Sequence, residues 1–309
     1  MELAIISGKG GTGKTSLVGS LAALAPGNIF VDCDVDAANL RLILGAENGH
    51  THDFIAGSRA VINPNKCTGS GECEKYCRYE AVKMVGEATA GSGRQATIDE
   101  YSCEGCGVCV QFCPNDAIAM KDIASGQWFV SPTKYGPLVH ARLGIAEANS
   151  GKLVSLLRKE AGRIATREKI GLIVIDGPPG LSCPVIASVT GVDYALIVTE
   201  ASVSSLHDMQ RLVELTGHFG LATGLCINKF DINEEMTSEI QAFAEQKNIP
   251  VLGKIPFEPG ITRAQLSGMP YLEYADNEAA RQIKNLWQNL EGQLKQLENH
   301  APNRADRLD

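Results

Sequence analysis

The feature that most constrains the fold lies at the start of the chain, where the apolar run Leu3–Ile6 leads into the glycine-rich segment Gly8-Lys-Gly-Gly-Thr-Gly-Lys-Thr15. This segment satisfies the pattern G-x-x-x-x-G-K-[ST], in which backbone N–H groups wrap around phosphate oxygens at the start of a helix. Such a turn needs a buried strand before it and a helix after it. We therefore expect the fold to begin with a strand, a phosphate-binding turn and a helix over Lys14–Ala25.

The side chains of this segment fit a nucleoside triphosphate and its magnesium ion. The pattern assigns Lys14 to the β- and γ-phosphates and Thr15 to Mg²⁺. A second magnesium element follows later, because the apolar run Leu172–Ile175 ends in Asp176, which is the Walker B arrangement. The residues of the segment that we expect to bind nucleotide are Gly8, Gly10, Gly11, Thr12, Gly13, Lys14, Thr15 and Ser16.

The same glycines satisfy a competing pattern. Gly8, Gly10 and Gly13 match the dinucleotide fingerprint G-x-G-x-x-G, and Asp32 lies near the position of its acidic residue. A triphosphate is favoured over a dinucleotide, because the pattern continues into a lysine and a threonine and is followed by the Walker B aspartate.

The chain outside its cysteine-rich part alternates between two kinds of segment. Short apolar runs bounded by Gly, Pro or Asp are typical of buried parallel strands, and longer segments have helical length and period. The expected strands are Leu3–Ile6, Asn28–Asp32, Leu172–Asp176, Tyr194–Thr199, Leu225–Asn228 and Val251–Ile255. The expected helices are Lys14–Ala25, Leu206–Thr216, Glu234–Gln246 and Asn277–Glu298. This alternation predicts an α/β fold with a doubly wound, mostly parallel sheet.

Seven of the ten cysteines lie between Cys67 and Cys113, in two similar halves offset by 36 residues. The second half is a complete bacterial ferredoxin run, C-x2-C-x2-C-x3-C-P, from Cys103 to Pro114. The first half lacks one cysteine, because Ser70 stands opposite Cys106. Four-cysteine zinc sites are built from two paired knuckles, so zinc fits this spacing less well.

In the bacterial ferredoxin run the fourth cysteine of each half ligates the other cluster. One expected cluster is therefore a [4Fe–4S] held by four thiolates. The other has three thiolates, with Ser70 at its fourth corner. That site can hold a [3Fe–4S] cluster, a four-iron cluster with Ser70 as an alkoxide ligand, or a labile [4Fe–4S] completed by an exogenous ligand. The expected ligand sets are Cys77, Cys103, Cys106 and Cys109 for the first, and Cys67, Cys73 and Cys113 for the second.

Composition and segment boundaries complete the domain prediction. We expect an ATPase domain over 1–57 and 123–300, an inserted ferredoxin-like domain over 58–122 and a flexible tail over 301–309. The formal net charge of −8 disfavours nucleic acid as a partner. The chain has no run of 18 apolar residues and no signal-peptide pattern. The last expected helix has an apolar stripe, but its polar face is not rich in Lys and Arg, as that of a membrane-surface helix would be. We therefore expect a cytoplasmic protein without stable membrane insertion, whose cysteines serve metals rather than disulfides.

Three segments resemble motifs of the MinD/ParA/Mrp and nitrogenase iron protein class. The glycine-rich segment, with Lys9 in it, resembles the deviant Walker A motif of that class. The stretch Asp32–Leu40 resembles its switch I, and the stretch Asp176–Gly180 resembles its switch II. Within that class, the chain is similar to MinD-type ATPases that carry an inserted ferredoxin domain. The resemblance implies a dimer, with itself or with a related ATPase, that encloses ATP or ADP with Mg²⁺.

The resemblance also implies roles for single residues. Lys9 would reach the partner's nucleotide, and Asp34 would orient the attacking water and join Thr15 and Asp176 around Mg²⁺, with Asp32 nearby. Asn228 would read adenine or cap its strand, with Pro256 and Phe257 packing on the base. Cys183 lies seven residues after Asp176, as does a cluster ligand of the nitrogenase iron protein, although a buried free thiol is the commoner role for a cysteine.

Together these features predict an ATPase whose nucleotide state controls electron transfer from its clusters to an unknown redox partner. The alternative is an Mrp-like iron–sulfur carrier or scaffold that hands a cluster to an acceptor. A further alternative is a MinD-like positioning ATPase with redox-sensing clusters.

Overall fold

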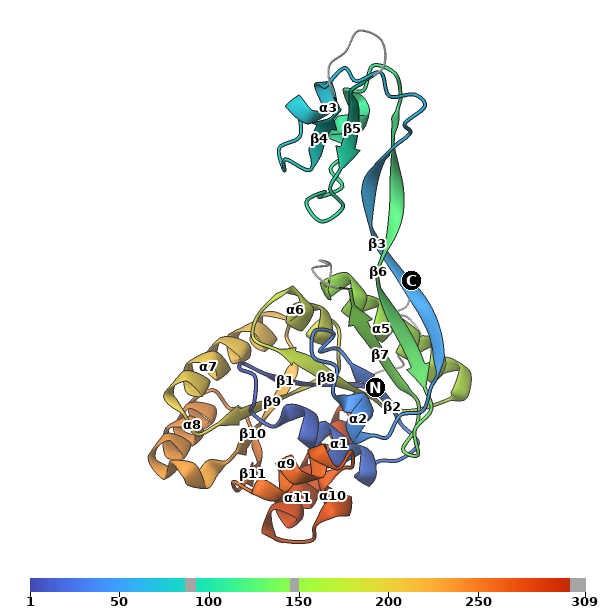
Figure 1. Ribbon diagram of the computed structural model, residues 1–309. Helices are drawn as coiled ribbons and strands as arrows, with labels where there is room; N and C mark the ends of the chain where they lie inside the picture. The colour runs from blue at the N-terminus through green and yellow to red at the C-terminus, as the bar shows by residue number, and fades with distance from the viewer. Residues whose placement is uncertain (87–92, 145–149, 301–309) are drawn as a thin grey trace. The chain divides into compact units, whose positions relative to one another are not determined.

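The computed structural model describes residues 1–86, 93–144 and 150–300, without the side chain of His300 (Figure 1). The chain divides into two compact units. The first unit comprises Met1–His52, Trp128–Arg142 and Ser150–Asp309, and the second comprises Asp53–Gln127 and Leu143–Asn149. The predicted boundaries at 58 and 122 fall inside the second unit, and the predicted tail, 301–309, lies outside the described residues.

The described residues form a nine-stranded sheet in the order β11-β10-β9-β1-β8-β2-β7-β6-β3, of which β3 and β6 extend into the second unit. From β11 to β7 the neighbouring strands are parallel. This confirms the predicted α/β fold with a mostly parallel sheet. The strands are β1 Glu2–Ser7, β2 Ile29–Asp32, β3 His50–Ile62, β6 Ile118–Ser131, β7 Leu138–Leu143, β8 Ile173–Pro179, β9 Tyr194–Glu200, β10 Ala222–Asn228 and β11 Val251–Ile255.

Helices cover both faces of the parallel strands (Figure 1). Leu3 and Ile5 of β1 belong to the same buried cluster as side chains of α1 and α11. On the opposite face, Ile6 lies beside Gly177, which approaches Ser188 of α6. The helices of the first unit are α1 Lys14–Leu24, α2 Leu40–Ile43, α5 Ser150–Glu168, α6 Cys183–Val189, α7 Val203–His218, α8 Glu234–Gln246, α9 Pro259–Leu266, α10 Tyr271–Tyr274 and α11 Glu278–His300.

Strands β3 and β6 carry the chain into the second unit and back. His52 stacks on Trp128, and the next residues, Asp53 and Gln127, are hydrogen-bonded. Residue numbers therefore rise along β3 as they fall along β6, so these two strands are antiparallel. Strands β3, β6 and β7 were not predicted from the sequence.

The second unit is built from two short halves. Helix α3, Glu72–Lys75, corresponds to α4, Val108–Gln111, at the offset of 36 residues found in the sequence. Each begins after a glycine in the left-handed region, Gly71 with φ 78° and Gly107 with φ 73°. Strands β4, Val82–Val85, and β5, Gln95–Ile98, form a separate antiparallel pair.

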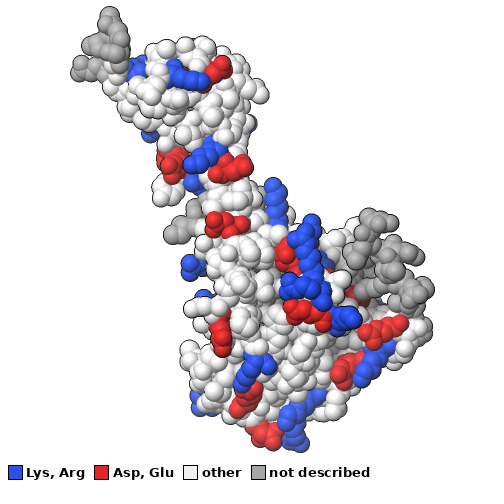
Figure 2. Space-filling view, turned by 90° about the vertical axis from the view of Figure 1, so that its right-hand side faces the viewer, with Lys and Arg blue, Asp and Glu red and all other residues white. Residues whose placement is uncertain are grey.

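Charges of both signs are interspersed on the face shown in Figure 2. Among the described residues, no helix is both long enough and apolar enough to cross a membrane. In parallel sheets the carboxyl ends of the strands meet at one edge, and ligands bind at that edge. This edge is therefore where the predicted nucleotide-binding residues should converge.

Candidate functional site

A cleft of about 660 Å³ lies at the carboxyl ends of the parallel strands. The segment after β1 forms one wall, and the segments after β2, β8, β10 and β11 supply the rest. Predicted residues that line it are Gly10, Gly11, Thr12, Gly13, Lys14, Thr15, Ser16, Asp34, Asn228, Pro256 and Phe257. Asp36, Asn39, Lys229 and Glu258 also line it and were not predicted.

The phosphate-binding turn is held by close backbone contacts. Gly13, which precedes α1, has φ 90°, and a Cβ there would lie 2.4 Å from Nδ2 of Asn228. The Asn228 amide donates a hydrogen bond to the carbonyl of Thr12 at 2.7 Å. Gly8 is just as restricted, because a Cβ there would lie 2.4 Å from Cβ of Asp208 on α7. Glycine at these positions therefore lets β10 and α7 approach the turn.

Lys14 and Asp176 form a buried ion pair, with Nζ 2.7 Å from Oδ1. Their side chains are 5% and 0% exposed. Burial lowers the pKa of Lys14, but Asp176, Asp32 and Asp34 together more than offset this, so that the pKa is raised and the amine stays charged. The other carboxylate oxygen of Asp176 is buried without a hydrogen-bond partner.

Asp32 is the buried anchor of the segment after β2. Its two carboxylate oxygens accept hydrogen bonds from the backbone N–H groups of Asp34 and Leu40, each at 3.1 Å. Burial and the neighbouring Asp176 raise its pKa well above the usual value. Burial also raises the pKa of Asp34. Three carboxyl groups thus gather around one lysine, and Mg²⁺, which prefers oxygen ligands, fits this excess of acidic groups and the unpartnered oxygen of Asp176.

Lys9 is held within its own chain. Its Nζ donates to Oε1 of Glu200, at the end of β9, at 2.8 Å. Lys229 donates to the other oxygen of Glu200 at 2.8 Å and to the carbonyl of Gly11 at 2.9 Å. Glu200 was not predicted from the sequence, although the argument from a strand end that found Asp176 also applies to it.

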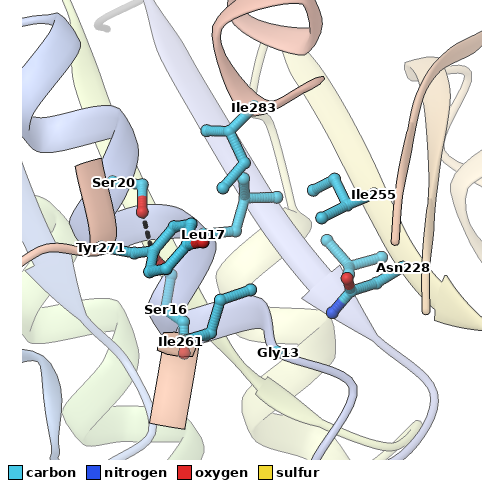
Figure 3. Close-up of a pocket in the computed structure, with 10 residues that line it drawn as sticks. Gly13, Ser16, Leu17, Ser20, Asn228, Ile255, Ile261, Tyr271 and Ile283 are labelled. Atoms are coloured by element: carbon cyan, nitrogen blue, oxygen red, sulfur yellow. Dashed lines mark hydrogen bonds between the residues drawn. The ribbon is translucent and has the colours of Figure 1, made fainter. Parts of the chain in front are cut away.

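A small second cavity lies behind α1 (Figure 3). Its lining is mostly apolar, with Ile255, Ile261 and Ile283 around the buried side of the helix. Ser20 donates to the carbonyl of Ser16 at 2.9 Å. The volume of this cavity, about 10 Å³, is at the lower limit for one water molecule. It is a packing gap, so the large cleft is the candidate nucleotide site.

The predicted cluster ligands line two cavities in the second unit. One cavity is lined by Cys67, Ser70, Cys73 and Cys113, and the other by Cys77, Cys103, Cys106 and Cys109. Each cavity therefore contains three ligand positions from one half and the fourth cysteine of the other half.

The thiols of each cavity are close enough to influence one another. Burial, together with Cys103, Cys106 and Cys77, raises the pKa of Cys109 to about 11. Burial also raises the pKa of Cys73, and Cys113 and Cys67 add to that rise. Iron binding would have to displace these thiol protons, because the thiolate is the ligand form. As the side chains stand, no group of three or more His, Cys, Asp or Glu among the described residues could hold a metal ion.

The remaining cysteines lie in the first unit. Cys183 is exposed at the first residue of α6, whereas Cys33 and Cys226 are buried. Burial, reinforced by Asp32, raises the pKa of Cys33, and burial alone raises that of Cys226 to about 12. The two buried thiols are therefore protonated packing residues.

Comparison with known proteins agrees with the geometry of the first unit. The family model for the CobQ/CobB/MinD/ParA nucleotide binding domain matches residues 3–271. An uncharacterised protein of Methanocaldococcus jannaschii is 36% identical over 236 residues, which cover 75% of this chain and 79% of the relative. An iron-sulfur cluster carrier protein of Pyrococcus furiosus is 23% identical, covering 96% of this chain and 87% of the relative.

The fold is also similar to a solved structure. The septum site-determining protein MinD of Pyrococcus horikoshii, complexed with Mg-ADP, superposes with a TM-score of 0.58 at 19% sequence identity. The match covers 96% of this chain and 98% of that one.

Proposed function

The chain belongs to the CobQ/CobB/MinD/ParA nucleotide-binding family and is a P-loop ATPase, and from this premise we propose that it couples ATP hydrolysis to electron transfer through two iron–sulfur clusters. The observation that carries the proposal is the pair of cysteine-lined cavities in the same chain as a complete phosphate-binding turn. The proposed functional unit is a dimer, of this chain or of this chain with a related ATPase.

Hydrolysis would use Lys14, Thr15 and Asp34, which line the cleft, together with Lys9 and the buried Asp176. Lys14 would bind the β- and γ-phosphates, and Thr15, Asp34 and Asp176 would hold Mg²⁺. Lys14 must then exchange its partner Asp176 for phosphate, which leaves Asp176 available to the metal. Lys9 would leave Glu200 and reach the partner's nucleotide as a charge-stabilising group.

The proposal assigns two clusters with different ligand sets to the two cysteine-lined cavities. Cys77, Cys103, Cys106 and Cys109 would hold a [4Fe–4S] cluster. Cys67, Cys73 and Cys113 would hold a [3Fe–4S] or labile [4Fe–4S] cluster, with Ser70 at its fourth corner. When bound, such clusters supply one-electron transfer at potentials set by their ligands and surroundings.

Contacts within the first unit offer a path from nucleotide to β3. The Asp32 carboxylate holds the first N–H of α2, at Leu40. Ile43 of the same helix packs against Gly19 of α1, where a Cβ would lie 2.5 Å from its Cγ2. The N–H of Glu47 donates to the carbonyl of Pro132, directly after β6, at 3.2 Å. A shift of Asp32 on MgATP binding would therefore move the segment that starts β3.

Cluster delivery is a second candidate function, and Ser70 is the observation that favours it. Ser70 is exposed and lines the three-thiol cavity, so the fourth corner of that site faces solvent without a thiolate. Relatives at 23% identity are named iron-sulfur cluster carrier proteins. In this reading ATP would trigger transfer of that cluster to an acceptor.

The decisive experiment uses anaerobically purified full-length protein. Iron and sulfide are counted, and the electron spin resonance signals are titrated with and without MgATP. Electron transfer predicts that MgATP shifts a cluster potential or line shape in the wild type. Thr15→Val, which keeps the side-chain shape but removes the hydroxyl for Mg²⁺, should not show the shift.

Other outcomes separate the candidates. Potentials that ignore nucleotide, together with ready loss of one cluster to an apo-acceptor, would favour delivery. In that case Ser70→Cys should slow the transfer and give a stable four-iron signal. Protein that binds no iron after anaerobic reconstitution would reject both proposals.

A further inference from the structure

The contact between Tyr76 and Phe112 is the feature of the second unit that the proposed function does not yet use. Their ring centroids lie 4.1 Å apart, with an angle of 22° between the planes. Both rings are partly exposed, at 40% and 46%. They lie outside the buried cluster formed by Ala60, Cys73, Val82, Ala96, Cys109 and Ile118.

The two rings occupy equivalent positions of the repeat. Tyr76 follows α3 and Phe112 follows α4, separated by the same 36 residues as the cysteines. Their backbone conformations also match, with φ of −95° at Tyr76 and −96° at Phe112. When a residue contacts its own equivalent, the contact lies on the two-fold axis that relates the halves. The stacked rings therefore mark the approximate two-fold axis of the second unit, where α3 and α4 pack together.

Each ring is followed directly by the cysteine that crosses to the other half. Cys77 comes after Tyr76 and lines the cavity of Cys103, Cys106 and Cys109. Cys113 comes after Phe112 and lines the cavity of Cys67 and Cys73. The stack thus joins the two backbone segments on which the relative placement of the cavities depends.

We propose that the Tyr76–Phe112 stack is a positioning element that fixes the separation and orientation of the two cysteine sites, and so sets the electronic coupling between them. The inference rests on the proposed function, because it requires both sites to hold clusters. The rings act through the neighbouring cysteine backbone and need not carry an electron themselves.

The test is a double-mutant cycle on anaerobically reconstituted full-length protein. Tyr76→Leu, Phe112→Leu and the double variant are compared with wild type by iron and sulfide content and by spin resonance of the reduced protein. At unchanged iron content, each single variant should change the magnetic interaction between the two sites. The double variant should show no further change, because either substitution alone already removes the stack.

Two controls make the result specific. Phe112→Tyr retains an aromatic ring at this position and should therefore keep the wild-type magnetic interaction between the two sites. Tyr101→Leu removes an aromatic side chain that is 85% exposed in the same unit and should leave the interaction unchanged.

The outcomes separate failure of the positioning role from failure of the proposed function. Wild-type interaction in iron-replete Tyr76→Leu and Phe112→Leu would overturn the positioning role and leave the clusters in place. Additive changes in the double variant would also overturn it, since they would show two independent local effects. Absence of iron from the wild type would instead remove the proposed function itself.

Discussion

The two units build their sites in different ways. In the first, strands such as β1 and β8 are almost completely buried, and the cleft lies at their ends. In the second, the buried cluster holds six residues, two of which are cysteines, and each of the two helices has four residues. Small folds with little core commonly need a metal or a disulfide for stability. The hydrophobic core of the first unit thus stabilises its site, whereas in the second unit the metal bound at the site must contribute to the stability of the fold.

Removal of iron should produce the largest difference between the two units. Chelation of the reconstituted protein under reducing conditions is expected to abolish amide protection in β4 and β5. Protection in β1, β8 and β9 should persist, because the cysteines that line both cavities belong to the second unit. Hydrogen exchange followed by mass spectrometry measures both units in one sample. Equal protection of β4 and β5 with and without iron would contradict this view.

Lys9→Ala should produce the next largest effect. ATP binding is expected to persist while turnover falls by about 10³-fold, in line with the loss of a charge-stabilising finger. Steady-state phosphate release and nucleotide titration measure the two properties. Lys284→Ala is a matched control, because Lys284 is also a partly exposed lysine in an ion pair, at 45% against 40% for Lys9. Unchanged turnover in Lys9→Ala would reject a role across the dimer.

Lys14→Ala should instead affect stability as well as binding. Removing the lysine leaves Asp176 buried and unpaired, which typically costs about 3–5 kcal/mol. Urea unfolding of nucleotide-free protein should show this loss for the first unit. Adding Asp176→Asn should recover part of the stability but not nucleotide binding. Lys9→Ala should cost no more than about 1 kcal/mol, because Lys9 is 40% exposed and Glu200 keeps Lys229 as its ion-pair partner.

The smallest effect concerns pH and should be confined to the first unit. His140, on β7, lies with Nε2 3.0 Å from Oγ of Ser131, and burial lowers its pKa to about 4. Unfolded histidine has a pKa of about 6.5, so the unfolded state binds more protons between these values. Stability should therefore fall as pH is lowered through this range, by at most about 3 kcal/mol.

His140→Gln isolates this contribution from the background of carboxyl groups. Glutamine keeps a group that can bond Ser131 but cannot titrate. Unfolding of the first unit, measured at pH 4.5 and 7, should differ less in the variant than in wild type. Equal differences in the two proteins would show that His140 contributes nothing to the pH dependence.

Much of the parallel sheet could be predicted, because each of its central strands is an apolar run buried on both faces. Strand β3 could not be predicted in this way, since only Phe54 and Ala60 of its 13 residues are buried. Helix α5 was missed although Leu153, Leu157 and Ile164 do give it a helical stripe. Side-chain partners were harder still: Lys9 and Glu200 are 191 residues apart, and nothing local in the sequence relates them.

The antiparallel pairing of β3 and β6 has a consequence for how such a chain could have arisen. Adjacent strands lie about 4.8 Å apart, so the inserted segment leaves the sheet and returns to it at nearly the same place. Its ends could be joined by a tight turn without stretching the sheet, as tolerated domain insertions require. The cysteine unit could therefore have been gained at a hairpin, or could be lost there, without changes to the strands of the nucleotide-binding unit.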